Sequence, residues 1–200
     1  MKTLLQINTS LFSERGHSSV LAGQFVEKWR QSNPGGRVVV RDLAASPVPH
    51  LTAARFQAFL TAAENRSAEQ AQHVAESDEL ILELESADIV VIGLPMYNFG
   101  IPSTLKAWID HVARAGRTFR YTDSGPVGLV ADRPVLLFAA RGGRYKGTPR
   151  DTQSAYISHF FNFIGVRDIE FVYAEGLAMG EDNRSLALDA AARVIDRIAA

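Results

Sequence analysis

A polar loop near the start of the chain carries the residues best suited to bind a phosphate group. It follows the first apolar run and contains Ser10, Gly16, His17, Ser18 and Ser19. The start of a helix binds anions because its first N–H groups are free and its dipole is positive there, while hydroxyls add donors and glycine permits close approach. Simple capping of the helix by Ser18 or Ser19 would explain the same residues. The position directly after a strand favours a phosphate site.

A second candidate segment follows the apolar run over residues 90–95. It consists of Met96, Tyr97, Asn98 and Phe99. Aromatic rings can flank a planar heterocycle, and an amide can both donate and accept hydrogen bonds at its edge. Core aromatics beside a turn would give the same pattern.

A third candidate segment, Arg141-Gly142-Gly143, comes after another apolar run. Paired glycines let backbone N–H groups reach a ligand's carbonyl edge, and Arg141 places positive charge nearby. A solvated loop would have the same composition. Each of the three segments is a weak signal alone, but all three lie at predicted carboxyl ends of strands, where open parallel sheets bind ligands.

A chain that alternates strand and helix patterns positions these segments. Apolar runs predict strands over residues 3–8, 37–43, 90–95, 134–140 and 168–174. Amphipathic patterns predict helices after residue 18 and over about 53–62, 67–85, 102–116, 151–164 and 182–199. The irregular stretch 44–66 indicates a lid or a partner-binding surface.

The alternation predicts an α/β fold with a five-stranded parallel sheet and helices on both faces. Five strands in 200 residues suit a flavodoxin-like sheet of order 2-1-3-4-5, with a small hairpin excursion over residues 117–129. That order places the binding crevice between the first and third strands, beside the Ser10 and Met96 loops. No linker or repeat divides the chain, so we expect one domain over residues 1–200.

Composition excludes several classes of function. Lys+Arg 21 against Asp+Glu 22 gives a net charge of −1, which favours neither nucleic acid nor a membrane surface as a partner. The absence of cysteine excludes disulfides, thiol nucleophiles and thiolate metal sites. The five histidines show no metal-ligand spacing, and His111 is expected at the surface. No window approaches the roughly 20 apolar residues of a membrane span, so a cytoplasmic location is the default.

Sequence signatures narrow the ligand further. Neither GxGxxG after a strand nor GxxxxGK[ST] occurs, so a mononucleotide with one phosphate fits better than a dinucleotide or a nucleoside triphosphate. The G-x-S-x-G nucleophile motif is also missing. The first strand ends in Asn8-Thr9-Ser10 rather than in paired acids, which argues against a receiver domain of the same topology.

From end to end the chain resembles the FMN-dependent NAD(P)H azoreductases of the flavodoxin-like fold, also described as NAD(P)H:quinone reductases. The resemblance rests on Arg41-Asp42-Leu43-Ala44, Pro95-Met96-Tyr97-Asn98-Phe99, Ala113-Arg114-Ala115-Gly116, Thr118-Phe119-Arg120-Tyr121-Thr122, Arg141-Gly142-Gly143 and Phe163-Ile164-Gly165. It implies a bound FMN, with Ser10 and residues 16–18 at the phosphate and residues 96–99 along the isoalloxazine. Asn98 would bond the polar edge of the flavin.

The resemblance also implies that residues 140–143 cover the pyrimidine end of the flavin, and that Tyr121 and Phe163 stack on substrate at a homodimer interface. Family members often carry serine at the position of Ala140, and Ser-x-Ser where this chain has Gly16-His17-Ser18. Two possible hydroxyl donors are therefore absent, so backbone N–H groups or His17 must replace them.

The implied activity is two-electron hydride transfer from NADH or NADPH to a quinone or azo compound, with ping-pong kinetics. No catalytic side chain is needed because flavin N5 carries the hydride. Three alternatives remain open: a flavodoxin-type electron carrier, a flavin reductase or modulator-type quinone reductase, and a non-catalytic interaction module. A strongly acidic docking face would favour the carrier, and the net charge gives no sign of one. The preferred nicotinamide and the physiological acceptor are not encoded in any recognisable motif.

Overall fold

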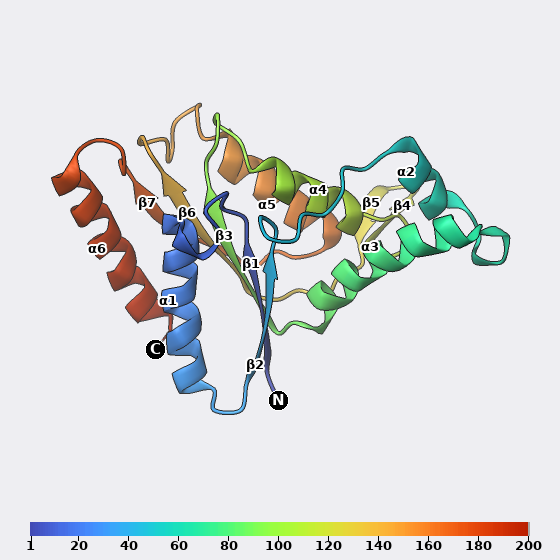
Figure 1. Cartoon of the computed structure of the whole chain (residues 1–200), viewed down its shortest axis with the longest axis horizontal. Helices are drawn as coiled ribbons and strands as arrows, with labels where there is room; N and C mark the ends of the chain where they lie inside the picture. Colours follow the sequence, from blue (N-terminus) through green and yellow to red (C-terminus); the bar gives the residue numbers. More distant parts are fainter. Residues whose placement is uncertain (200) are drawn as a thin grey trace.

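The computed structural model describes residues 1–199, and a parallel sheet forms its centre (Figure 1). The sheet contains β1 (Thr3–Asn8), β2 (Arg37–Asp42), β3 (Ile89–Pro95), β6 (Val135–Arg141) and β7 (Ile169–Glu175). The strands lie in the order β2-β1-β3-β6-β7, and every neighbouring pair is parallel. This order differs in its labels from the expected 2-1-3-4-5, because β4 and β5 form a separate hairpin and take two numbers along the chain.

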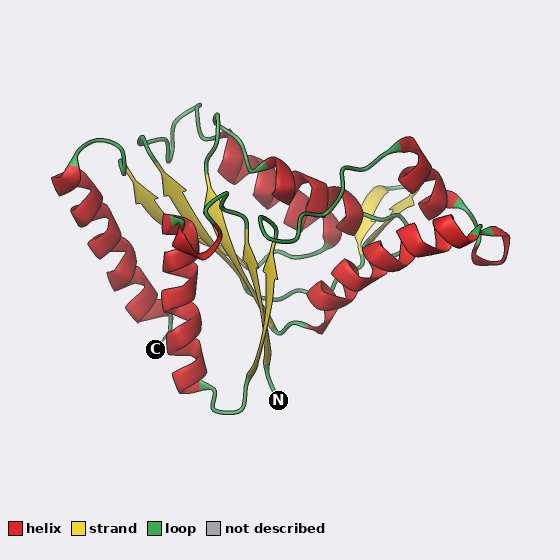
Figure 2. Ribbon diagram, viewed as in Figure 1, coloured by secondary structure: helices red, strands yellow, loops and turns green. Residues whose placement is uncertain are grey.

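Helices cover both faces of the sheet (Figure 2). On one face lie α1 (His17–Ser32) and α6 (Glu181–Ile198), and on the other lie α3 (Ala68–Ser86), α4 (Ser103–Val112) and α5 (Thr152–Ile164). Each face has its own apolar cluster, which explains why β3 and β6 are continuous apolar runs. Within residues 44–66 the chain forms α2 (Ala53–Leu60), which packs against α3, and a short 3-10 helix, η2 (Ala63–Asn65).

The predicted excursion is an antiparallel hairpin of β4 (Phe119–Thr122) and β5 (Gly125–Gly128). Its base is tied to α5, since Val130 N–H donates to the Ile164 carbonyl at 2.9 Å. The preceding helix α4 ends at Val112 rather than at the expected Gly116. The chain turns there because Thr118 Oγ1 donates to the Val112 carbonyl, and because the Arg114 guanidinium reaches Asp78 on α3 at 2.8 Å.

His111 is fully buried, so the expectation that it lies at the surface is wrong. Phe59 of α2 covers it with an edge-on ring contact. Nothing in the sequence near His111 indicates this contact, because Phe59 lies far away along the chain. The His111 Nδ1 pairs with the Ala107 carbonyl at 2.9 Å, which leaves Nε2 without a hydrogen-bond partner. Burial lowers the pKa of His111 below its ordinary value, and the nearby charge of Arg55 lowers it further.

Two further findings concern the residues described. No helix among them combines the length and apolar character that crossing a membrane requires. Across residues 1–199, no group of three or more His, Asp or Glu side chains is arranged to hold a metal ion.

Candidate functional site

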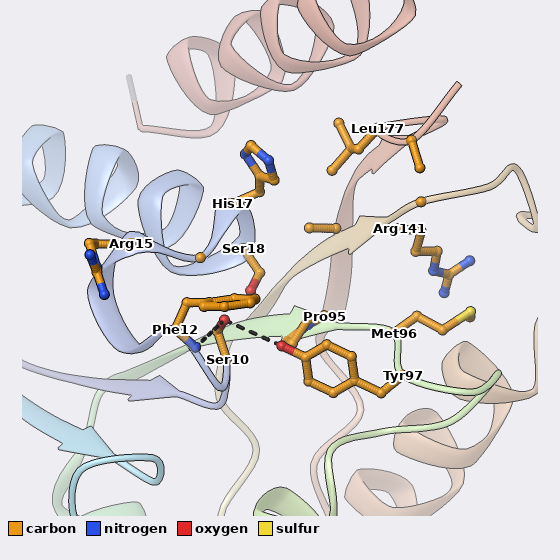
Figure 3. A pocket seen from close by; sticks show the side chains of 14 residues that line it. Ser10, Phe12, Arg15, His17, Ser18, Pro95, Met96, Tyr97, Arg141 and Leu177 are labelled. Atoms are coloured by element: carbon orange, nitrogen blue, oxygen red, sulfur yellow. Dashed lines mark hydrogen bonds between the residues drawn. The ribbon is translucent and has the colours of Figure 1, made fainter. Parts of the chain in front are cut away.

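A cavity of about 330 Å³ lies at the carboxyl ends of β1, β3 and β6, close to the crevice expected from the strand order (Figure 3). Nine predicted site residues line it: Ser10, Gly16, His17, Ser18, Met96, Tyr97, Ala140, Arg141 and Gly142. Its volume falls in the range of small-molecule sites, roughly 300–1,000 Å³.

The start of α1 forms one wall of this cavity and has free donors. Its N-cap is Gly16, which has no side chain to accept a hydrogen bond from the first turn. The hydroxyls of Ser18 and Ser19 are buried and have no hydrogen-bond partner. The alternative that one of these serines simply caps the helix is therefore wrong. A helix start with free N–H groups and a buried Ser18 hydroxyl inside a cavity is suited to an anion.

Ser10 and Gly16 meet closely at this wall. A Cβ at Gly16 would lie 2.1 Å from Ser10 Oγ, so a larger residue would displace one of the two. Ser10 Oγ accepts a hydrogen bond from the Phe12 N–H at 3.2 Å and lies 3.4 Å from the Tyr97 hydroxyl. That hydroxyl also accepts the Leu11 N–H at 3.2 Å. Tyr97 thus joins the loop after β1 to the loop after β3.

Residues 97–100 form a tight turn closed by two backbone hydrogen bonds between Tyr97 and Gly100, of 3.1 and 3.0 Å. Its central residues, Asn98 and Phe99, have φ of 49° and 65°. Two positive φ values identify a type I′ turn, which asparagine accepts readily. For phenylalanine this conformation costs on the order of 1–3 kcal/mol. The turn therefore holds strain at the edge of the site.

Three predicted residues line a second, adjoining cavity instead. Asn98, Phe99 and Gly143 surround a space of about 270 Å³, which also touches Tyr145. Met96 and Gly142 line both cavities. The two spaces together extend from the start of α1, past the β3 turn, to the glycines after β6. An elongated ligand with one anionic end would suit that path.

Arg141 does not offer its charge to the cavity, which corrects the expectation for this residue. Its side chain is fully buried and pairs with Asp151 at 2.8 Å and with Glu175 at 3.0 Å. Its guanidinium also lies over the Tyr173 ring, 5.0 Å from the centroid. Figure 3 shows the Arg141 side chain directed away from Ser10 and Ser18. Only the backbone of this residue is left to contact a ligand.

The Arg141 guanidinium affects the pKa of the Asp151 carboxyl. Burial alone would raise the pKa of Asp151, but its hydrogen bonds with the Arg141 guanidinium and with Ser154 lower that pKa below the ordinary value. Burial raises the pKa of Tyr173, whose hydroxyl lies 3.0 Å from Ser154 Oγ. The cluster is a closed, charged and hydrogen-bonded unit behind the cavity wall.

Residues that sequence reasoning missed also line the main cavity: Phe12, Arg15, Pro95, Leu177 and Ala178. Leu177 and Ala178 follow β7, and their N–H groups donate to the carbonyls of Arg141 and Gly142. The expected strands over residues 134–140 and 168–174 are neighbours in the expected sheet. The loop after the second of them could therefore have been predicted to lie beside residues 140–143. Phe12 and Arg15 lie in the phosphate-type loop, where the serines drew attention instead.

Two predicted residues, Tyr121 and Phe163, line neither cavity. Both contact Phe119 at the hairpin, with ring centroids 5.5 and 4.3 Å away. Tyr121 is 73% exposed. Within the described chain these aromatics therefore form a separate group.

Comparisons with known proteins agree with this geometry. A family model described as flavodoxin-like fold matches residues 1–198. A protein of Cellvibrio japonicus called FMN-dependent NADH:quinone oxidoreductase is 58% identical over 94% of each chain. A Burkholderia lata protein called FMN-dependent NADH:quinone oxidoreductase 6 is 51% identical over 98% of each.

Solved structures give the same result. An azoreductase from Bacillus anthracis has a TM-score of 0.91 at 29% identity, covering 100% of this chain and 99% of its own. A second structure from that organism, an FMN-dependent NADH-azoreductase in complex with FMN, has a TM-score of 0.88 at 26% identity, with both chains fully covered. The chain thus belongs to the flavodoxin-like family, among the FMN-dependent NADH:quinone oxidoreductases.

Proposed function

We propose that this protein is an FMN-dependent NADH oxidoreductase that reduces quinones and azo compounds by two electrons. The names of its relatives supply the cofactor, the donor and the acceptor classes. One observation in this chain carries the proposal. The Ser18 hydroxyl is buried without a hydrogen-bond partner, and it lies beside the cavity at the start of α1, where no side chain caps the helix. A buried hydroxyl without a partner is costly, and the phosphate of FMN would satisfy it.

The residues present fit FMN along the whole path. Ser10, Gly16, His17 and Ser18 would hold the phosphate, with Arg15 beside them. Met96, Tyr97, Asn98 and Phe99 would line the isoalloxazine, and the backbone of Ala140, Arg141, Gly142 and Gly143 would meet its pyrimidine end. Bound FMN supplies the acceptance and release of two electrons.

The protein's own part is binding and orientation. The type I′ turn carries Asn98, which lines the same cavity as Gly142 and Gly143, so that the amide and the backbone after β6 would face one polar edge of the flavin. No nucleophilic side chain is required, and the donor and the acceptor use one pocket in turn, which gives ping-pong kinetics.

The proposal includes a homodimer in which each copy completes the other's site. Tyr121 and Phe163 line neither cavity of their own chain, yet Tyr121 is largely exposed on a hairpin that projects from the sheet. A second copy could bring these aromatics over the flavin face. Residues 1–200 would act as one FMN-binding domain, cytoplasmic with its NADH supply, with small molecules rather than nucleic acid, membrane or metal as ligands.

An electron carrier is the second candidate function, because its fold and cofactor would be the same. Such carriers use acidic surfaces to steer docking, and a net charge of −1 gives no support to it. An interaction module without cofactor would leave the strained turn and the Ser18 hydroxyl without a purpose.

Anaerobic half-reactions test the function. Purified yellow protein should be bleached by NADH and should regain its colour when a quinone is added. Failure of either half-reaction would contradict the proposed enzyme. Bleaching without reoxidation by quinone, but with reoxidation by a protein acceptor, would favour the carrier.

Two substitutions of Asn98 distinguish the contribution of its amide to FMN binding from the contribution of its backbone conformation in the turn. Asn98→Gly keeps positive φ without strain, whereas Asn98→Ala loses both amide and conformational ease. Weaker FMN retention or slower turnover in both variants would assign the effect to the amide. A loss in Asn98→Ala alone would assign it to the turn, and wild-type flavin content and rates in both would remove Asn98 from the site.

A further inference from the structure

Gln153, in the first turn of α5, lies directly behind the turn at residues 97–100 and is 1% exposed. Its amide nitrogen donates to the Pro95 carbonyl at 2.7 Å and to the Gly100 carbonyl at 3.2 Å. These two carbonyls flank the segment that carries Asn98 and Phe99. One buried side chain therefore bonds to the backbone on both sides of the strained pair, Asn98 and Phe99.

Arg141 fixes which way the Gln153 amide points. Its Nε donates to Gln153 Oε1 at 3.3 Å. A guanidinium has only donors, so the amide oxygen must face Arg141 and the NH₂ group must face the two carbonyls. The flipped amide would place its oxygen against carbonyl oxygens and its NH₂ against a cation. The fully buried Arg141 is in turn held by Asp151 and Glu175.

The same cluster holds the loop on the other side of the site. Glu175 Oε1 accepts the N–H groups of Tyr145 and Lys146, both at 2.9 Å, in addition to Arg141. The loop after β6 and the turn after β3 are thus connected through the Arg141–Gln153 contact. Thr152 adds a hydrogen bond from its hydroxyl to the Phe99 carbonyl.

We propose that Gln153, oriented by Arg141, is a positioning residue that sets the geometry of the flavin-binding turn. This inference rests on the proposed function, because it concerns how the same site binds FMN. Without the two hydrogen bonds, Asn98 and Phe99 have less to hold them in the left-handed region, and the turn relaxes away from the ligand. Gln153 itself lines neither cavity that would hold the flavin.

Two substitutions of Gln153 test the proposal. Gln153→Met removes both hydrogen bonds at similar size, and we expect the FMN dissociation constant to rise roughly tenfold at every pH. Gln153→Glu keeps the shape but turns a carboxylate oxygen toward two carbonyls. Burial, the two facing carbonyls and the nearby Asp151 and Glu175 carboxylates raise the pKa of the introduced carboxyl above its ordinary value, against the lowering effect of Arg141, and its protonated form can donate again. FMN binding by Gln153→Glu should therefore recover toward wild type as the pH is lowered.

The measurements are FMN titration of apoprotein by fluorescence quenching, and the visible absorption and circular dichroism of the bound flavin. Each value is compared with wild type at the same pH, which removes the titration of the FMN phosphate itself. Both variants should shift the flavin spectrum. A wild-type dissociation constant and spectrum in Gln153→Met would overturn the proposal, as would pH-independent weakening in Gln153→Glu.

Arg133→Met is the matched control, because the Arg133 side chain also donates to backbone carbonyls, those of Leu84, Glu85, Ala87 and Ala131. It should lower thermal stability and leave FMN affinity and the flavin spectrum unchanged. An equal loss of FMN affinity in this variant would reduce the Gln153 effect to general destabilisation and overturn the proposal. If wild-type protein binds FMN and reduces quinone while the Gln153 variants are unchanged, only this inference fails; if wild type binds no FMN, both fail.

Discussion

The two ends of the central sheet are built in opposite ways. At the amino ends of the strands, Asp132 accepts the N–H groups of Arg133, Arg167 and Asp168, and the Arg133 side chain donates to four backbone carbonyls. At the carboxyl ends lie the unpartnered Ser18 hydroxyl and the strained turn. The three non-glycine residues described with positive φ are Ser13, Asn98 and Phe99. All three belong to loops that leave carboxyl ends.

This difference indicates that the amino ends of the strands serve the stability of the fold, whereas the carboxyl ends serve ligand binding. Loops at the amino ends satisfy their polar groups within the chain and need no ligand. Loops at the carboxyl ends contain unpaired hydrogen-bond donors and unfavourable backbone conformations. Proteins tolerate such features chiefly at binding sites, where contact with a ligand compensates for them. Substitutions at the two ends should therefore affect different measurements.

Gly16→Ala should cause the largest loss of binding. The new Cβ would lie 2.1 Å from Ser10 Oγ, so Ser10 or the start of α1 must move. Overpacking costs about 1–3 kcal/mol, which corresponds to a rise of roughly fivefold to 150-fold in the FMN dissociation constant. Gly23→Ala is the control: it lies in the same helix with open space around it, and should raise the free energy of unfolding by about 0.5–1 kcal/mol. Equal FMN affinity in both variants would contradict the placement of the phosphate.

Arg133→Met tests the amino end. It leaves four carbonyls without their donor, and we expect the free energy of unfolding in urea to fall by about 2 kcal/mol. FMN affinity should stay the same. A change in affinity larger than the change in stability would show that the two ends are coupled.

Ser18→Ala should not destabilise the protein without FMN, but it should weaken the binding of FMN. Without FMN the variant loses only an unsatisfied hydroxyl, so the apoprotein should be as stable as wild type or slightly more so. With FMN it loses the donor that we propose for the phosphate, and the dissociation constant should rise about fivefold to tenfold. Thermal melts of both forms measure this, and a destabilised apoprotein would mean that Ser18 has a structural partner.

The smallest expected effect concerns pH and His111. Its pKa in the folded state is lowered, chiefly by burial, so the unfolded chain binds the proton more readily. The stability is therefore complete above the unfolded pKa of about 6.5 and falls as the pH drops from there toward the folded value. His111→Gln should flatten this part of the urea stability profile. An unchanged slope below about pH 6.5 would show that other groups cause it.

Most of the fold could be predicted because its signals are local. Asn33-Pro34-Gly35-Gly36 stops α1, and continuous apolar runs identify β3 and β6 as covered on both faces. The end of α4 was placed too late, because Arg114 leaves the helix to reach Asp78 on α3, which lies 36 residues away in the chain.

The site was predictable in location and less so in the roles of its side chains. Residues with binding chemistry at strand ends were found, since topology alone brings those ends together. Arg141 was misjudged because its partners Asp151 and Glu175 lie 10 and 34 residues away, and a buried ion pair has no sequence signature. Gln153 was overlooked for the same reason: its importance comes from carbonyls more than 50 residues distant.

The route of the chain through the sheet also sets the order of events during synthesis. Residues 10–18 leave the ribosome early, but the remaining walls come from residues 95–97, 140–142 and 177–178. β1 must wait for β3 before it is flanked on both sides. The complete site can exist only once the chain has been made as far as residue 178, so the cofactor cannot guide the first stages of folding. Any stability that bound flavin adds is therefore gained by a chain whose synthesis is almost finished.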